Sequence, residues 1–272
     1  MTGTPRTVPA LPPLARRLLA EFLGTALLVT VVVGSGVAAQ QLSPTDTGLQ
    51  LLENSTATVF GLAVLIVMLG PISGAHFNPV VSAADWLLGR RRGTGMTGSA
   101  VGAYALAQIA GGIAGAVLAN VMFDLSAFQL STKERITAGH VVGEVVATAG
   151  LILLIFALAR TGRAALSAAA VGAYIGAAYW FTSSTSFANP AVTIGRIFSD
   201  TFAGIAPSSA PAFVAAQCVG GLIGLALVVV LYPDATATAD NAVVPHGARP
   251  ARQPAGPAHP GDPDRRERPG PG

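Results

Sequence analysis

Six long apolar stretches constrain most strongly how this chain can fold. They run roughly over residues 18–39, 51–70, 99–122, 139–159, 164–182 and 210–232. A helix needs about 20 mostly apolar residues to cross the hydrocarbon core of a bilayer. Only 11% of the residues are charged, against about 25% in a typical soluble protein. The sequence therefore predicts an all-α membrane protein with six transmembrane helices.

Two further apolar stretches, about 77–88 and 189–198, are too short to cross a membrane. Each contains an Asn-Pro pair at or near its start and follows a loop rich in small residues. Proline suits the first turn of a helix, where its missing N–H costs nothing. Non-helical backbone at membrane depth is tolerated only where protein buries it or a water-filled cavity is present. Both stretches are predicted to be re-entrant half-helices.

The two halves of the chain repeat one pattern: a glutamate, then Asn-Pro, then Gln-x-x-Gly-Gly. The matching positions are Glu21 and Glu144, Asn78-Pro79 and Asn189-Pro190, and Gln108 and Gln217. Three spans in each half make the repeat inverted, because the halves enter from opposite sides. We expect one channel domain over 14–232 (repeats about 14–122 and 139–232), a loose arm over 1–13 and a disordered cytoplasmic tail over 233–272.

Basic residues predict the orientation of the chain. Placing both termini on one side gathers 13 of the 16 basic residues there and leaves only Lys133, Arg135 and Arg196 on the other. Such residues concentrate on the cytoplasmic side. We therefore expect a multi-pass protein of the cell membrane with both termini in the cytoplasm. The scattered basic residues do not indicate nucleic-acid binding, and the lone Cys218 is expected to be a small packed residue.

The inverted repeat brings two helix N-termini and two asparagines to the middle of the membrane. Positive dipole ends there oppose a cation, and the Asn78 and Asn189 amides offer donors to the oxygen of a neutral solute. The predicted midplane residues are Asn78, Pro79, Val80, Asn189, Pro190 and Ala191. The predicted pore-lining loop residues are His76, Phe77, Phe187 and Ala188, whose carbonyls offer acceptors. Small uncharged solutes fit such a path, and ions do not.

Glu21 and Glu144 are carboxylates at membrane depth. Each is predicted to brace a re-entrant loop by accepting its backbone N–H groups, with a proton relay as the alternative. His76 is interpreted as a loop-bracing or pore-wall residue rather than a pH gate, and Asp85 as a brace for the end of the first half-helix. No nucleophile–base pair and no metal-ligand cluster occurs in the sequence. We expect neither an enzyme nor a bound cofactor or metal.

The segment from Ser73 to Val80 and the triplet at Asn189, with the repeated Glu and Gln-x-x-Gly-Gly, resemble the aquaporin/glycerol-facilitator (major intrinsic protein) family over roughly 14–232. The resemblance implies a homotetramer, one pore per subunit, passive bidirectional flow and Asn78 and Asn189 as midplane donors. Residues around both boxes also resemble a bacterial aquaglyceroporin-like subgroup found with arsenic-resistance genes. That likeness implies a neutral metalloid such as arsenous acid.

The chain departs from the family pattern at two positions. Val80 stands where the first box usually has alanine, and Val192 where an arginine usually follows the second Asn-Pro-Ala. Arg196 lies one helical turn further on. It is expected at the half-helix end or in a subunit contact rather than as a replacement.

Counting from the two boxes, the resemblance implies a selectivity filter of Thr58, Ala177, Ser186 and Val192. A small shift of register would substitute Phe60, Tyr179 or Trp180. The four counted residues predict a wide, uncharged filter and hence neutral solutes larger than water. The alternatives are a water-selective channel, a proton-coupled transporter and a non-conducting scaffold.

Overall fold

The computed structural model describes residues 12–90 and 95–233, and all of its regular elements there are helical. The predicted arm over 1–13 and tail over 233–272 fall almost wholly outside the described residues.

Six helices in the described part are long and apolar enough to cross a membrane. They are α1 (Leu14–Leu42), α2 (Thr47–Ser73), α4 (Gly98–Met122), α5 (Ala138–Arg160), α6 (Ser167–Phe181), which a short 3₁₀ turn (Ala164–Leu166) precedes, and α8 (Ala210–Leu231). The predicted spans are confirmed, although α1 and α2 extend several residues beyond the apolar runs. Polar residues at these ends, such as Gln40 and Gln41 of α1, continue the helix past the stretch that the apolar pattern marks.

Two short helices, α3 (Pro79–Gly89) and α7 (Pro190–Arg196), begin at the Asn-Pro pairs. In each pair the proline occupies the first helical turn and the asparagine is the N-cap. The side-chain oxygen of Asn78 accepts from the N–H of Val80 at 3.0 Å. The side-chain oxygen of Asn189 accepts from the N–H groups of the two residues after Pro190. The Asn-Pro pair is therefore a helix-start signal in both halves.

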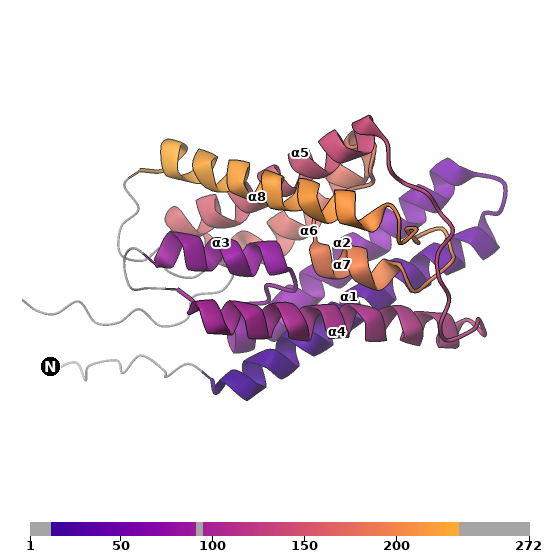
Figure 1. Ribbon diagram of the computed structural model, residues 1–272, viewed down its shortest axis with the longest axis horizontal. Coiled ribbons are helices and arrows are strands. Elements are labelled where there is room, and N and C mark those ends of the chain that lie inside the picture. Colours follow the sequence, from indigo (N-terminus) through magenta and orange to yellow (C-terminus); the bar gives the residue numbers. More distant parts are fainter. Residues whose placement is uncertain (1–11, 91–94, 234–272) are drawn as a thin grey trace, which may run out of the picture.

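The helices form an elongated bundle with two distinct ends (Figure 1). Helix α1 begins and α8 finishes at one end, here named the terminal end. The segments 43–46, 123–137 and 197–209 lie at the opposite end, named the loop end. From the middle of the bundle, α3 runs toward the terminal end and α7 toward the loop end (Figure 1). The half-helices thus enter from opposite ends, as an inverted repeat requires.

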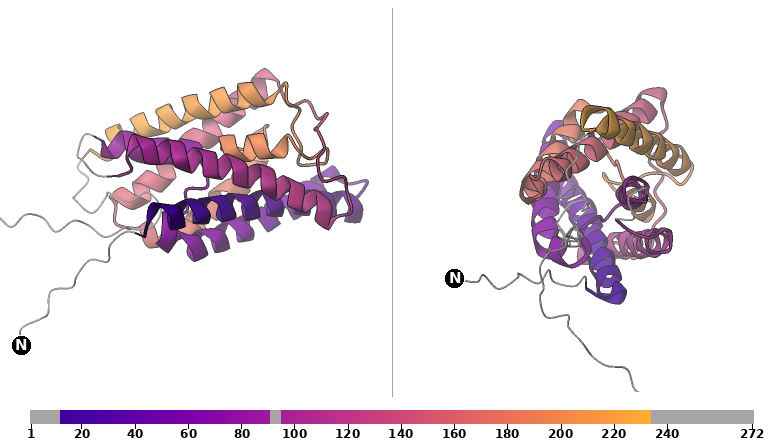
Figure 2. Two further views of the ribbon diagram at one scale, coloured as in Figure 1. Left: turned by 60° about the horizontal axis from the view of Figure 1, so that its bottom comes forward. Right: turned by 90° about the vertical axis from the view of Figure 1, so that its left-hand side faces the viewer.

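The two halves interlock rather than pack as separate units. Helix α1 makes its most extensive contact with α4, and α5 makes the equivalent contact with α8. Each half-helix packs on the last long helix of both halves, since α3 contacts α4 and α8, and α7 contacts the same two helices. The view along the bundle shows the long helices arranged around these short ones (Figure 2). The repeat therefore produces one continuous domain.

Glycines allow the main helix pairs to approach closely. A Cβ atom added at Gly220 of α8 would lie 2.5 Å from the carbonyl oxygen of Val145 on α5, and one at Gly224 would lie 2.6 Å from that of Ala149. In the first half, Gly111 and Gly115 of α4 meet backbone carbonyls of α1 in the same way. Small residues of this kind drive helix association in membranes, where close van der Waals packing replaces the hydrophobic effect.

The outer surface of the bundle is apolar, as contact with lipid or another subunit requires. Phe60, Leu106 and Val230 are each more than two-thirds exposed. Trp180 also lies on this surface, so neither it nor Phe60 substitutes for a counted filter residue. Cys218 is exposed on α8, and the expectation of a packed thiol is wrong. On a helix that is apolar all round, hydropathy alone does not distinguish the inward face from the outward one.

Candidate functional site

The loops before α3 and α7 have the same unusual backbone conformation. Ala75 and Phe77, three residues and one residue before the first asparagine, have φ angles of 50° and 49°. Ser186 and Ala188 occupy the equivalent places in the second half, both with φ of 50°. Non-glycine residues with positive φ are strained and persist only where the surroundings determine the backbone. The two halves therefore repeat the backbone conformation of the loop as well as its sequence pattern.

In the first half, Glu21 of α1 accepts hydrogen bonds from the strained loop. Its carboxylate accepts the backbone N–H of His76 at 3.0 Å and that of Phe77 at 2.7 Å. Gln108 of α4 donates to the same carboxylate at 2.7 Å. Glu21 is 0% exposed, so these donors replace water as its partners.

Glu144 of α5 makes the equivalent contacts in the second half. It accepts the backbone N–H groups of Phe187 and Ala188, both at 2.8 Å, and the side-chain amide of Gln217 at 2.6 Å. Both glutamates thus have the hydrogen-bond geometry expected of loop-bracing residues. The three sequence features that repeat, glutamate, asparagine and glutamine, converge on each loop.

The two asparagines connect the halves across the middle of the bundle. The amide nitrogen of Asn78 donates to the carbonyl oxygen of Ala188 at 2.8 Å, and that of Asn189 donates to the carbonyl oxygen of Phe77 at 2.7 Å. A side-chain amide carries two N–H groups. One N–H of each asparagine therefore links the loops, and the second has no hydrogen-bond acceptor among the described residues.

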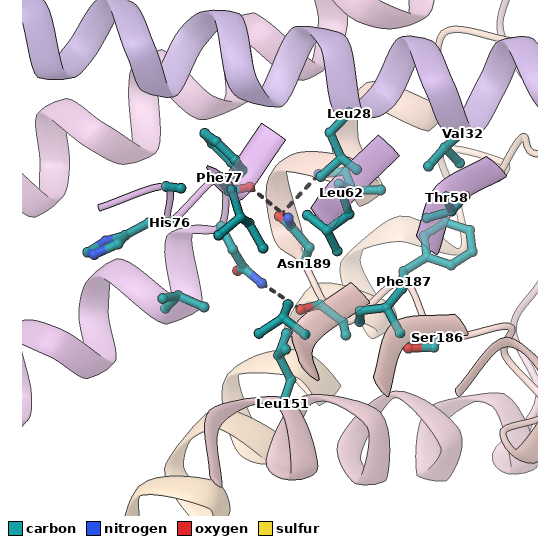
Figure 3. Close-up of a pocket in the computed structure, with 18 of the residues that line it drawn as sticks. Leu28, Val32, Thr58, Leu62, His76, Phe77, Leu151, Ser186, Phe187 and Asn189 are labelled. Atoms are coloured by element: carbon teal, nitrogen blue, oxygen red, sulfur yellow. Dashed lines mark hydrogen bonds between the residues drawn. The ribbon is translucent and has the colours of Figure 1, made fainter. Parts of the chain in front are cut away.

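A narrow cavity with a volume of about 60 Å³ runs past both asparagines. Its wall combines aliphatic side chains of the long helices with the two loops (Figure 3). The polar and aromatic residues that line it are Thr58, His76, Phe77, Asn78, Tyr179, Ser186, Phe187, Asn189 and Arg196. All four predicted loop residues line this cavity. The other four predicted midplane residues, Pro79, Val80, Pro190 and Ala191, lie in the first turns of the half-helices and not on the cavity wall.

Three of the four counted filter residues, Thr58, Ser186 and Val192, line the cavity together. Ala177 does not, because it lies on the exposed face of α6. Tyr179, two positions further on and about 200° around the helix, lines the cavity instead, and its hydroxyl lies 3.2 Å from that of Thr58. Counting back from the second Asn-Pro pair therefore gave Ala177, which is two residues before the residue that lines the cavity. The sequence offered Tyr179 as one of the shifted choices.

Arg196 lies at the half-helix end, as expected, and it also lines the cavity, which was not expected. It is the last residue of α7 and is 2% exposed. Its Nε donates to the carbonyl oxygen of Ala203, and its guanidinium carbon lies 3.4 Å from the centroid of the Phe187 ring. The predicted uncharged filter therefore has a cation beside it. The one-turn spacing from Val192 was the available signal, since it keeps Arg196 on the same helix face.

Arg135 and Lys133, from the segment 123–137, lie near Arg196 at the loop end, a proximity that the sequence did not indicate. Burial lowers the pKa of Arg135 to about 10. Burial, followed by the charges of Arg135 and Arg196, lowers the pKa of Lys133 to about 8. No motif marks these two cations, because a connecting segment of irregular backbone positions them.

His76 and Asp85 lie toward the terminal end. The Nδ1 of His76 is 3.0 Å from the hydroxyl of Ser82, one turn into α3, and the ring lines the cavity. The carboxylate of Asp85 accepts the backbone N–H of Met96 at 3.0 Å. Asp85 therefore ties α3 to the segment that leads into α4.

Comparison with known proteins places this geometry in a family. The pattern of the family described as "Major intrinsic protein" matches residues 10–188. The chain is 49% identical over 214 residues to aquaglyceroporin AqpS of Rhizobium meliloti, covering 79% of this chain and 89% of that protein. It is 31% identical over 255 residues to human aquaporin-2, covering 87% and 86%.

A solved structure has the same fold. The X-ray structure of the aquaglyceroporin from Plasmodium falciparum superimposes with a TM-score of 0.56 at 20% identity, covering 79% of this chain and 96% of that chain. Family pattern, curated relatives and fold agree with the paired Asn-Pro half-helices. The chain therefore belongs to the major intrinsic protein family, whose members are multi-pass membrane channels and not enzymes.

Proposed function

We propose that this protein is a passive, bidirectional channel for small uncharged solutes wider than water. The solutes are glycerol-like polyols or neutral metalloids such as arsenous acid. Val192 carries this proposal. It lines the cavity directly after the second Asn-Pro-Ala, where the family resemblance implies an arginine. Valine leaves more width there and removes the hydrogen-bond donors of an arginine from that position. The name of the 49% identical relative, an aquaglyceroporin, supports the same class of solute.

The burial and hydrogen bonds of the two glutamates favour passive flow over proton coupling. A coupled carrier of this type would need Glu21 or Glu144 to titrate during transport. Both are 0% exposed, and each accepts two backbone N–H groups of a strained loop. Protonation would remove acceptors on which the loop geometry depends. These carboxylates are suited to holding the pore wall.

A water-selective channel is the second candidate, and the aromatic residues at the cavity favour it. The Tyr179 hydroxyl pairs with Thr58, and the Phe187 ring lines the same wall. If these rings set the width of the pore, water would pass and larger solutes would be excluded. The two candidates differ in one property, the passage of solutes larger than water.

Stopped-flow light scattering on proteoliposomes separates the candidates, with water, glycerol and arsenous acid as solutes. We expect the wild type to pass all three. We expect Val192→Arg to lower glycerol and arsenous acid permeability by at least about tenfold, with a smaller effect on water, because the longer side chain narrows the filter. Val192→Leu is the matched control, since it keeps an apolar side chain and should change glycerol permeability far less than the arginine.

Two results would contradict the wide filter. Wild-type liposomes that pass water alone would mean that Tyr179 and Phe187 set the width. Equal glycerol permeability in the wild type and Val192→Arg would mean that Val192 is not the determinant. Flux that requires a proton gradient would instead indicate a coupled transporter.

The proposal includes placement and assembly: a homotetramer in the cell membrane, with the terminal end in the cytoplasm. Five arginines of the described residues, Arg16, Arg17, Arg90, Arg160 and Arg163, belong to the terminal end. This asymmetry supports the orientation. The apolar outer surface suits contacts with lipid and with neighbouring subunits.

A further inference from the structure

Arg196 presents donors to the cavity that no protein group uses. Its Nε–H donates to Ala203, while its four other N–H groups form no hydrogen bond within residues 12–90 and 95–233. A guanidinium has five such donors in a fixed plane. Because Arg196 lines the cavity, these four groups are available to a passing solute.

Arg135 approaches the same aromatic ring from a different part of the chain. Its Nε donates to the carbonyl oxygen of Gly204 at 2.7 Å and its terminal nitrogen to that of Phe202 at 2.9 Å. Its guanidinium carbon lies 5.2 Å from the centroid of the Phe187 ring. The carbonyls of three consecutive residues, 202–204, thus fix both arginines, and Phe187 lies within cation–π range of both.

The positive charge at this end is not neutralised by direct pairing. Lys133 also donates to the carbonyl of Phe202, at 2.9 Å. In the described part of the chain, none of these three cations forms a salt bridge with a carboxylate. Glu144 attracts both arginines only across a distance, since its oxygens accept loop N–H groups. Lys133 is exposed, whereas Arg135 and Arg196 are buried. Burying a cation without a counter-ion is costly, and a buried charge at a membrane pore marks a functional position.

A second polar group, Ser186, points to a ligand at the same place. Its hydroxyl is buried and has no hydrogen-bond partner among the described residues. Ser186 is 3% exposed and lines the cavity directly before Phe187. The cavity wall therefore combines free donors of Arg196, the hydroxyl of Ser186 and the apolar side chain of Val192. A neutral solute with neighbouring oxygen atoms and one apolar edge satisfies all three.

We infer that Arg196, rather than the residue directly after the second Asn-Pro-Ala, is the solute-binding and cation-excluding residue of this pore, and that Arg135 is its positioning residue. The inference rests on the proposed channel function. The fixed charge of Arg196 then lies one helical turn from Val192. The pore stays wide at Val192, and the guanidinium repels cations one turn away.

The test compares two fluxes in proteoliposomes. Glycerol entry is followed by light scattering. Potassium leak is followed with a potassium-sensitive dye, with a protonophore present to balance charge. We expect Arg196→Gln to raise potassium leak by at least about tenfold. The repulsion between a guanidinium and a nearby potassium ion exceeds the free energy that corresponds to a tenfold change. Glycerol entry should fall but remain measurable, because the solute loses the donors of Arg196 while the path stays open. The remaining entry reports a folded pore. Arg163 is an exposed arginine at the terminal end. The matched control Arg163→Gln should leave the potassium leak unchanged.

A double variant tests position directly. Combining Arg196→Gln with Val192→Arg returns the charge to the place that the family resemblance implies. This variant should restore low potassium leak and should pass less glycerol than Arg196→Gln alone. Restored exclusion without a loss of glycerol flux would contradict the link between charge position and pore width.

Arg135 is tested by conservative rescue. Arg135→Gln should raise potassium leak in the same direction as Arg196→Gln, and Arg135→Lys, which keeps the charge, should restore most of the exclusion. If Arg196→Gln misfolds and abolishes glycerol entry, the two Arg135 variants still test whether these arginines exclude cations. Wild-type liposomes that do not pass glycerol would refute the channel proposal itself. Normal glycerol flux with unchanged leak in the Arg196 and Arg135 variants would refute this inference alone.

Discussion

At the scale of single residues, Glu144 shows how one side chain can determine a loop. The backbone of Ser186 and Ala188 has left-handed φ angles that ordinary residues avoid. The two oxygens of Glu144 each accept one N–H of that loop, at 2.8 Å. These hydrogen bonds offset the strain and give the buried N–H groups of Phe187 and Ala188 their partners.

Glu144→Gln should therefore destabilise the fold. The glutamine side chain has one acceptor oxygen and an amide that faces a loop N–H, so one buried donor loses its partner. Such a loss costs about 1–3 kcal/mol. The midpoint of thermal unfolding in detergent, followed by size-exclusion chromatography after heating, should fall. Asp124→Asn removes the same charge at an exposed position and should leave the midpoint unchanged. Equal midpoints for the two variants would contradict the bracing role.

Arg196 also shows the limit of reading a site from sequence. The Asn-Pro boxes and the two glutamates were predictable because each is a local signal that the second half repeats. The roles of Tyr179 and Arg196 depend on the rotation of α6 and on the path of the segment 197–209, which no periodic pattern records. Arg135 lies in irregular backbone, where position depends on carbonyl contacts formed only in the folded chain.

At the scale of helices, contacts between α1 and α4 and between α5 and α8 hold the bundle together. These helices are apolar on all sides, so hydrophobicity does not select which faces meet. Glycine does, because a backbone without Cβ admits a neighbouring backbone. The Gly-x-x-x-Gly spacing, at 111 and 115 in α4 and at 220 and 224 in α8, marks these faces in both halves.

Gly115→Ala should weaken the contact between α1 and α4. The added methyl group would collide with the carbonyl oxygen of Ala26, and overpacking of this kind costs about 1–3 kcal/mol. The yield of folded protein in detergent and its unfolding midpoint should both decrease. Gly102→Ala on the same helix meets no atom within 4 Å and should be neutral or slightly stabilising. If both substitutions behave alike, close packing at Gly115 is not a stabilising feature.

At the scale of the whole molecule, the two ends differ in charge. Arginines flank the helices at the terminal end, whereas the cations of the loop end are Lys133, Arg135 and Arg196, all held by backbone carbonyls. In the described part of the chain, five arginines flank the helices at the terminal end, against three cations at the loop end. The excess of arginines at the terminal end supports the proposed placement of that end in the cytoplasm.

Reporter fusions check this orientation. A fluorescent protein fused to the C-terminus should fluoresce, and alkaline phosphatase at the same place should be inactive, because the phosphatase needs the oxidising side of the membrane to form its disulfides. Phosphatase fused after residue 130, in the segment 123–137, should be active. The reverse pattern of activities would mean that the chain inserts with its loop end in the cytoplasm.

The crossed hydrogen bonds from Asn78 to Ala188 and from Asn189 to Phe77 have a consequence for the biogenesis of the protein. When the ribosome has made only the first half, the Asn78 amide and the Phe77 carbonyl lack their native partners, which lie 110 and 112 residues further along the chain. The first re-entrant loop is thus incomplete for most of synthesis. We expect the wall of the proposed pore to be complete only when the second half folds against the first, so the half-made chain should not breach the membrane barrier.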